Sequence, residues 1–175
     1  MKPRVGISRC LLGDDVRYDG THKRSLAVIA LGEWVEWEPV CPEVEVGMGV
    51  PREPIQLVAR ADGIPSLAER VRLVGVESGE DWTTRMDQWN QHRVEELVAA
   101  GISGFVLKAR SPSCGPGGVP VRRAGNESAP TGRGLFADAL LLAMPGLPMA
   151  DEEALEDPQA REAFLQRVRQ FLRTR

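Results

Sequence analysis

The sequence predicts an α/β protein built around a mainly parallel β-sheet. Short apolar segments rich in β-branched residues alternate along the chain with segments whose apolar residues recur at helical spacing. Such alternation is typical of βαβ units, in which strands lie parallel and helices cover the sheet. With 175 residues, the chain is long enough for a substantial hydrophobic core. We therefore expect residues 1–175 to form a single domain with a three-layer, Rossmann-like fold.

Two predicted strands in the first part of the chain each run into a cysteine. The first strand covers residues 3–10, and the second ends at Cys41. Between them, Thr21 is expected to be the N-cap of a helix that closes near Gly32. Each of these strands therefore brings a thiol to its carboxyl end.

The middle of the chain is predicted to contain an irregular segment, a pair of strands and a long helix. Residues 42–54 are too rich in Pro and Gly for regular structure. Residues 55–60 and 70–75 alternate apolar and polar side chains, and we expect them to pair as a small antiparallel excursion. The clearest helix covers residues 82–100, with its apolar residues on one stripe and a glycine directly after it.

The last part of the chain is predicted to hold two short strands, a long polar loop and two helices. Residues 102–108 form a strand, and residues 110–131 form a loop whose length suggests a functional role or disorder. The Gly-Arg-Gly sequence at 132–134 opens an apolar helix. Residues 147–149 are the last expected strand, and an Asp-Pro pair at 157–158 begins the final helix.

Charge and the N-terminal segment argue against several classes of protein. The formal net charge is only −3, which gives no strong field to indicate a nucleic acid or a membrane as partner. No apolar run approaches the length of a transmembrane helix, and residues 1–4 enter a strand without a signal-peptide core. An odd number of cysteines without an export signal fits a protein of the reducing cytoplasm.

The strongest functional signal in the sequence is its three cysteines, Cys10, Cys41 and Cys114. Each follows an apolar stretch that is predicted to be a buried strand. If these strands are parallel, all three thiols emerge at the carboxyl edge of the sheet, where open α/β sheets bind ligands. In a reducing compartment, such cysteines are more often metal-binding or catalytic than disulfide-bonded. The alternative is three unrelated buried cysteines, because free cysteine is a common core residue.

Three thiolates can hold a metal ion or a cluster and leave one coordination position open. Catalytic zinc sites keep one position for water or substrate in this way. Iron–sulfur clusters are also held by cysteine thiolates, usually by four, so three protein ligands would expose one iron as a Lewis acid. The residues by themselves leave zinc and an iron–sulfur cluster as alternatives.

Four blocks of sequence resemble, in order, the TudS-type thiouracil desulfidase family, which was long catalogued only as a bacterial domain of unknown function. The blocks read SRCLLG with VRYDG (8–13 and 16–20), CPEV with GVPR (41–44 and 49–52), LKARSPSCG (107–115) and GRGLFA (132–137). Together they span most of the chain and are specific for the family. The stretch VEVGMG at 44–49 is less glycine-rich than in the shorter desulfidases. It is closer to the branch in which this domain is often fused to a second domain.

The resemblance implies a [4Fe-4S] cluster held by Cys10, Cys41 and Cys114, with the fourth iron free to take a thiocarbonyl sulfur. The implied reaction removes sulfur from a thiolated uracil base or nucleotide, 2-thio or 4-thio, and requires no net redox change. The cluster would act as Lewis acid and sulfide acceptor while an activated water attacks the carbon. A tRNA substrate is less expected, because the acidic chain lacks the basic stripe of a large RNA footprint.

Two side chains close to the cysteines in sequence are expected to be catalytic. Glu43, two residues beyond Cys41, is the best candidate for general acid and base. Glu45 is its rival, and a solvated loop carboxylate is the alternative interpretation of Glu43. Ser111 is expected to donate a hydrogen bond to the substrate or to relay a proton, although a serine before a proline often only shapes a turn.

Four further residues are expected to bind the substrate: Tyr18, Lys108, Ser113 and Arg133. Tyr18 could stack on a pyrimidine or pack against its own loop. Arg133 lies at a predicted helix N-terminus, where free N–H groups and the helix dipole favour phosphate. Other basic residues flank the cysteines in the sequence and could hold a nucleotide phosphate beside them: Arg17, Lys23, Arg52 and Arg110. The alternative is that they are solvated surface charges, which is an equally good interpretation for Lys23 and Arg52.

Two competing functions would use the same cysteines. The first is a non-catalytic metal- or redox-sensing protein that binds zinc or a cluster. The second is an acyl- or thiol-transfer enzyme in which one cysteine is the nucleophile and no metal takes part. The second function predicts that one cysteine is essential and the other two are dispensable.

Overall fold

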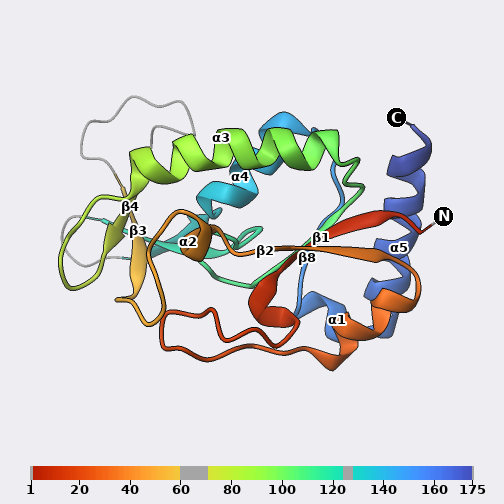
Figure 1. The fold of residues 1–175 in the computed structure, drawn as a ribbon, viewed down its shortest axis with the longest axis horizontal. Coiled ribbons are helices and arrows are strands. Elements are labelled where there is room, and N and C mark those ends of the chain that lie inside the picture. Colours follow the sequence, from red (N-terminus) through yellow and green to blue (C-terminus); the bar gives the residue numbers. More distant parts are fainter. Residues whose placement is uncertain (1, 60–70, 124–127, 175) are drawn as a thin grey trace.

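The computed structural model describes residues 2–59, 71–123 and 128–174 and confirms the α/β fold class (Figure 1). The strands of the main sheet, sheet A, are β1 (Arg4–Ser8), β2 (Glu36–Val40), β5 (Phe105–Leu107) and β8 (Met149–Asp151). They are all parallel, in the order β2-β1-β5-β8. Strand β1 pairs with both β2 and β5, so the carboxyl ends of these three strands meet at one edge.

Helices cover both faces of sheet A and produce the three predicted layers (Figure 1). They are α1 (Leu26–Ala30) and α5 (Pro158–Arg173) on one face and α3 (Thr83–Ala99) and α4 (Leu135–Ala143) on the other. Successive side chains of a strand point to opposite faces. Val5, Ile7 and Val106 therefore pack with α1 and α5, whereas Phe105 and Leu107 pack with α3 and α4.

A second, mixed sheet, sheet B, contains the predicted antiparallel excursion. Its strands are β3 (Ile55–Ala59), β4 (Val71–Gly75), β6 (Val119–Arg122) and β7 (Ser128–Gly132), in the order β4-β3-β6-β7. Strands β3 and β4 pair antiparallel as expected, and the predicted strand ends at residues 60 and 70 lie outside the described residues.

Strands β6 and β7 correct the prediction of a continuous loop at 110–131. Val119 and Val121 are buried and the residues after each of them are exposed, which is the period-two pattern of a strand with one buried face. β6 pairs with β3 on one side and with β7 on the other. Neighbouring glycines and prolines obscure this short alternation in the sequence.

Helix α1 begins at a later residue than the sequence predicts. Ser25, not Thr21, is the N-cap, and its Oγ accepts a hydrogen bond from the Val28 N–H at 3.3 Å. The Thr21 hydroxyl is already engaged, because it donates to Asp19 and accepts from Arg17. A local side-chain turn thus competes with helix capping.

The segment at 42–54 begins with a short helix, α2 (Pro42–Glu45), where irregular structure was expected. Proline is tolerated in the first turn of a helix, because the N–H that it lacks would have no intrahelical partner there. Gly47 and Gly49 follow with φ values of 99° and 78°, a left-handed conformation that glycine adopts readily. Three single turns of 3-10 helix complete the described structure: η1 (Arg9–Leu11), η2 (Leu31–Glu33) and η4 (Ala154–Glu156).

The long helices agree with the sequence prediction. Asp157 is the N-cap of α5, and its carboxylate accepts a hydrogen bond from the Gln159 N–H at 3.0 Å. Within the described ranges, none of the helices combines the length and the apolar character needed to cross a membrane.

Candidate active site

Three thiols reach one cavity at the carboxyl edge of sheet A. Cys10 lies in η1 directly after β1, Cys41 directly follows β2, and Cys114 lies in the loop after β5. All three line a cavity of about 390 Å³, and all three are free cysteines. The alternative of three unrelated core cysteines therefore does not describe their placement.

Burial dominates the acid–base state of these thiols. It raises the pKa of Cys10 to about 12, and the neighbouring Cys41 adds to the rise. Burial likewise raises the pKa values of Cys41 and Cys114, and nearby negative charge acts in the same direction. Because each thiolate opposes the others, three thiolates can coexist here only beside positive charge, which a metal centre would supply.

The donor set fits an iron–sulfur cluster. Thiolates are the protein ligands of such clusters, and three of them leave one iron without a protein ligand. In the part of the chain that the structure describes, no group of three or more His, Cys, Asp or Glu side chains is placed to hold a single metal ion. The thiolates of a cluster bind different iron atoms, so they need not surround one point. Cys10, Cys41 and Cys114 could therefore hold a cluster.

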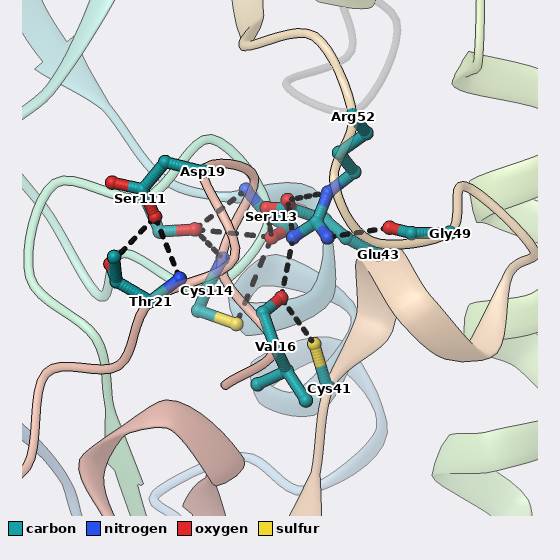
Figure 2. A network of polar contacts seen from close by, with 10 residues as sticks. All are labelled: Val16, Asp19, Thr21, Cys41, Glu43, Gly49, Arg52, Ser111, Ser113 and Cys114. Carbon is teal, nitrogen blue, oxygen red and sulfur yellow. Dashed lines mark hydrogen bonds and ion pairs between the residues drawn. The ribbon is translucent and has the colours of Figure 1, made fainter. Parts of the chain in front are cut away.

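Glu43 lines the cavity from α2 and has a partner on each carboxylate oxygen (Figure 2). Its Oε1 accepts a hydrogen bond from Ser113 Oγ at 2.7 Å. Its Oε2 accepts two from the Arg52 guanidinium, at 2.9 Å from Nε and 2.6 Å from Nη2. The Glu43 side chain is only 13% exposed, so it is not a solvated loop carboxylate.

Glu45, the rival acid/base candidate, is engaged in a local structural contact. Its Oε1 accepts a hydrogen bond from the Cys41 N–H at 2.9 Å, and its Oε2 lies 3.5 Å from Arg93 Nε. Of the two carboxylates, Glu43 is among the described residues that line the cavity and Glu45 is not. The geometry favours Glu43.

Ser111 and Ser113 connect Glu43 to the turn before Cys114 (Figure 2). The two hydroxyl oxygens lie 3.1 Å apart. Ser111 Oγ also accepts hydrogen bonds from the N–H groups of Ser113 and Cys114, at 3.3 and 3.1 Å, so this serine shapes the turn as well. Ser113 Oγ lies 3.8 Å from Cys114 Sγ. A continuous polar path therefore runs from Ser111 to Glu43 beside the third thiol.

Lys108 and Tyr18 line the same cavity, but the charge of Lys108 is already paired. Lys108 Nζ forms an ion pair with Glu152 and donates to the Ala109 carbonyl at 3.0 Å. The other Glu152 oxygen accepts a hydrogen bond from the Ala109 N–H at 2.7 Å. This bond ties the segment that leads to Cys114 (residues 108–114, the third cysteine segment) to the residue that follows β8. Tyr18 is 39% exposed, and the guanidinium of Arg17 lies 5.4 Å from the centre of its ring.

The structure does not bring Arg133 to the cavity with the other predicted site residues. Its Nε donates to the Pro116 carbonyl at 3.0 Å and its Nη1 to Asp138 at 2.8 Å. Arg133 is missing from the cavity lining in the described ranges. Its guanidinium is thus held by the bend between Cys114 and β6 and by α4.

The first turn of α4 supports the third cysteine segment. The N–H groups of Leu135 and Phe136 donate to the carbonyls of Pro112 and Ser113 at 3.2 and 2.9 Å. A Cβ on Gly134 would lie 2.4 Å from the Ser113 carbonyl oxygen, so only glycine permits this approach. These N–H groups, which the sequence suggested for phosphate, are used to hold a loop.

Two partners in this site are not indicated by the sequence. In the sequence, Arg52 is equally compatible with a surface charge, and no pattern marks Glu152 as a site residue. Arg52 is nine residues from Glu43, and Glu152 is 44 residues from Lys108, so neither pair produces a periodic pattern. Only the position of Arg52 at the end of the GVPR block (49–52), which resembles the family, marks it as a possible site residue.

Comparisons with known proteins agree with the resemblance seen in the sequence. A family model described as 2-thiouracil desulfurase matches residues 5–152. An uncharacterized protein of Bacillus subtilis (strain 168), YbbK, is 30% identical over 151 residues, which cover 86% of this chain and 97% of that protein. A solved structure named as the [4Fe-4S]-dependent thiouracil desulfidase TudS matches with a TM-score of 0.69 and 32% identity, over 93% of this chain and 97% of that one. The chain therefore belongs to the 2-thiouracil desulfurase family.

Proposed function

We propose that this chain is a desulfidase that removes sulfur from a thiolated uracil, as a free base or a nucleotide, and leaves the oxo base. The observation that carries the proposal is the shared cavity, which three cysteine thiols and the hydrogen-bonded Glu43–Ser113 pair all line. Membership of the family and likeness to a solved [4Fe-4S]-dependent thiouracil desulfidase support it.

In this proposal, Cys10, Cys41 and Cys114 hold a [4Fe-4S] cluster. When bound, the cluster supplies a Lewis-acidic iron that has no protein ligand and can polarise the thiocarbonyl group. The chain also places polar groups beside the ligand thiols. Ser113 Oγ lies 3.8 Å from Cys114 Sγ, and the Val16 carbonyl lies 4.0 Å from Cys41 Sγ.

Glu43 serves as general base and acid in this proposal. Its Oε2 is occupied by Arg52, so Oε1 takes a proton from the attacking water. Ser113 Oγ orients Oε1 and, with Ser111, offers a path for that proton. Water replaces sulfur at the same oxidation state of carbon, and its two protons leave with the sulfide, so no electrons are consumed. Loss of the carboxylate is expected to slow the reaction by about 10²- to 10⁴-fold.

The cavity suits a small anionic substrate. Glu43 is the single carboxylate among the described residues that line it, and the basic ones are Arg9, Arg17, Lys23, Arg52, Lys108 and Arg110. Of these, Lys23 has no ion-pair partner in the described ranges, so it is available to a phosphate. Tyr18 offers a half-exposed ring for stacking on a pyrimidine. These features favour a thiouracil nucleotide over tRNA.

We further propose that the chain works as one domain in the reducing cytoplasm. Its three free thiols line one cavity, and an oxidising compartment would favour a disulfide between two of them.

Anaerobic purification followed by an assay of sulfide release tests the proposal. The cluster predicts a brown protein with absorbance at about 400 nm and about four irons per chain. The activity predicts sulfide and a loss of thiocarbonyl absorbance from 2-thiouracil, 4-thiouracil or 4-thiouridine monophosphate. A colourless protein with about one zinc per chain would contradict the proposal. A cluster-loaded chain that releases no sulfide from any of the three substrates would also contradict it.

A further inference from the structure

Arg52 carries a guanidinium that is buried beside the cavity and engaged with protein atoms on every nitrogen (Figure 2). Its side chain is only 7% exposed. Nε and Nη2 donate to Glu43 Oε2, and Nη1 donates to the Gly49 carbonyl at 2.8 Å. Nη2 also donates to the Val16 carbonyl at 3.0 Å. This arginine is therefore occupied by the protein rather than held ready for a ligand.

The contact with Val16 links Arg52 to the two chain segments that contain Cys10 and Cys41. Val16 lies in the loop that follows Cys10. Its carbonyl oxygen accepts from Arg52 and also lies 4.0 Å from Cys41 Sγ. The Val16 carbonyl thus contacts both the Arg52 guanidinium and the Cys41 thiol.

The Glu43 contact links Arg52 to the third cysteine segment. Two nitrogens of the guanidinium converge on one oxygen, Oε2, and leave Oε1 to Ser113. Ser113 directly precedes Cys114. Charge-assisted hydrogen bonds are stronger than neutral ones, and the planar guanidinium fixes their direction. The carboxylate plane is therefore held so that a defined oxygen lies against Ser113.

We propose that Arg52 is a positioning residue of the desulfidase reaction. It does not touch the substrate, and it holds Glu43 so that Oε1 contacts Ser113 and can receive the proton. This inference rests on the proposed function, because it gives Arg52 a task within that reaction. The competing interpretation is that Arg52 binds the substrate directly through an anionic group.

A double-mutant cycle separates these roles. We compare the wild-type chain with Arg52→Gln, Glu43→Gln and the double variant, all loaded with iron anaerobically, and measure kcat and KM per cluster. We expect Arg52→Gln to lower kcat by about 10- to 100-fold, the usual cost of a misplaced catalytic group. KM should stay within about twofold, because no substrate contact is removed. In the Glu43→Gln background, loss of Arg52 should lower kcat by less than about twofold, because the two residues act as a unit.

Arg161→Gln is the matched control. Arg161 also donates its Nη1 to backbone carbonyls, those of Leu155 and Glu156 at 2.6 and 2.9 Å, and it does not line the cavity. This variant should keep the wild-type kcat.

Several results would overturn the positioning role. A KM that rises for 4-thiouridine monophosphate but not for 4-thiouracil would make Arg52 a phosphate ligand. Losses in kcat that multiply in the double variant would show that Arg52 acts independently of Glu43, which rejects the positioning role. If Arg52→Gln loses its iron, the Arg52→Lys variant decides the question. We expect Arg52→Lys to keep its iron and to show the loss of kcat. Loss of iron from Arg52→Lys, or a wild-type kcat in that variant, would reject the positioning role. A wild-type chain that releases no sulfide would remove the proposed function itself, whereas an active wild type with an equally active Arg52→Gln rejects only the inference.

Discussion

At Gly134, a single added methyl group should disturb the third cysteine segment. A Cβ at this position would lie 2.4 Å from the Ser113 carbonyl oxygen and 2.8 Å from the Cys114 nitrogen. These are backbone atoms, which cannot rotate away as the end of a side chain could. Gly134 has φ −61° and ψ 146°, a conformation that any residue adopts. Gly134→Ala therefore acts through contact alone and not through backbone strain.

The structure sets the size of the effect through two contributions. Overpacking of a well-packed region typically costs about 1–3 kcal/mol. Displacing the segment also weakens the hydrogen bonds from the Gly134 N–H to Gly115 and from the Phe136 N–H to Ser113, both 2.9 Å long. Each such bond contributes about 1 kcal/mol net. We expect a loss of about 2–4 kcal/mol in the free energy of unfolding, and a Tm lower by roughly 5–15 °C.

Urea denaturation of the metal-free chain measures this loss, and iron per chain after anaerobic reconstitution reports the displacement of Cys114. Gly117→Ala is the matched control, because Gly117 follows the same cysteine and its Cβ would meet no atom within 4 Å. The reasoning is refuted if Gly134→Ala unfolds within about 0.5 kcal/mol of the control, the usual range for a neutral surface change, and also binds the full complement of iron.

Three further predictions concern the ligands, an ion pair and the response to acid. Replacing any one of the three cysteines by alanine should reduce bound iron and abolish sulfide release, whereas a nucleophile mechanism needs only one of them. Glu152→Gln leaves the largely buried Lys108 ammonium unpaired and should lower the free energy of unfolding by about 3 kcal/mol; an unchanged urea midpoint would contradict this. Hydrogen bonds from Ser78 and from the Glu77 N–H hold the pKa of Glu53 below its ordinary value of 4.5. Its contribution to stability is thus present above pH 4.5 and lost as the pH falls through the folded pKa, so Glu53→Gln should flatten that part of the stability–pH curve.

The parallel strands and the cysteines at their ends could be predicted because both depend on local sequence. A run such as residues 4–8 is apolar and β-branched enough to be a strand in any α/β context. Parallel βαβ connections then place the ends of such strands at one edge. Cys10 and Cys41 follow from these two rules without knowledge of their partners.

The remaining features depend on partners that are distant in sequence. Strand β6 exists because β3 and β7 pair with it, and its own residues sit among glycines and prolines. The Lys108–Glu152 pair joins segments that follow two different strands. Only the tertiary structure brings these groups together, so no local pattern could predict them.

The start of α4 illustrates how one physical feature supports two opposite interpretations. A helix N-terminus presents N–H groups without intrahelical partners, and these need acceptors from outside the helix. The sequence suggested a phosphate as the acceptor, whereas the structure supplies the carbonyls of Pro112 and Ser113. These hydrogen bonds give the segment before Cys114 a rigid support. They also leave fewer N–H groups at the start of α4 to bind an anion. In the proposed function, a phosphate of the substrate would therefore find a better partner in Lys23, the cation of the cavity lining that has no ion-pair partner in the described part of the chain.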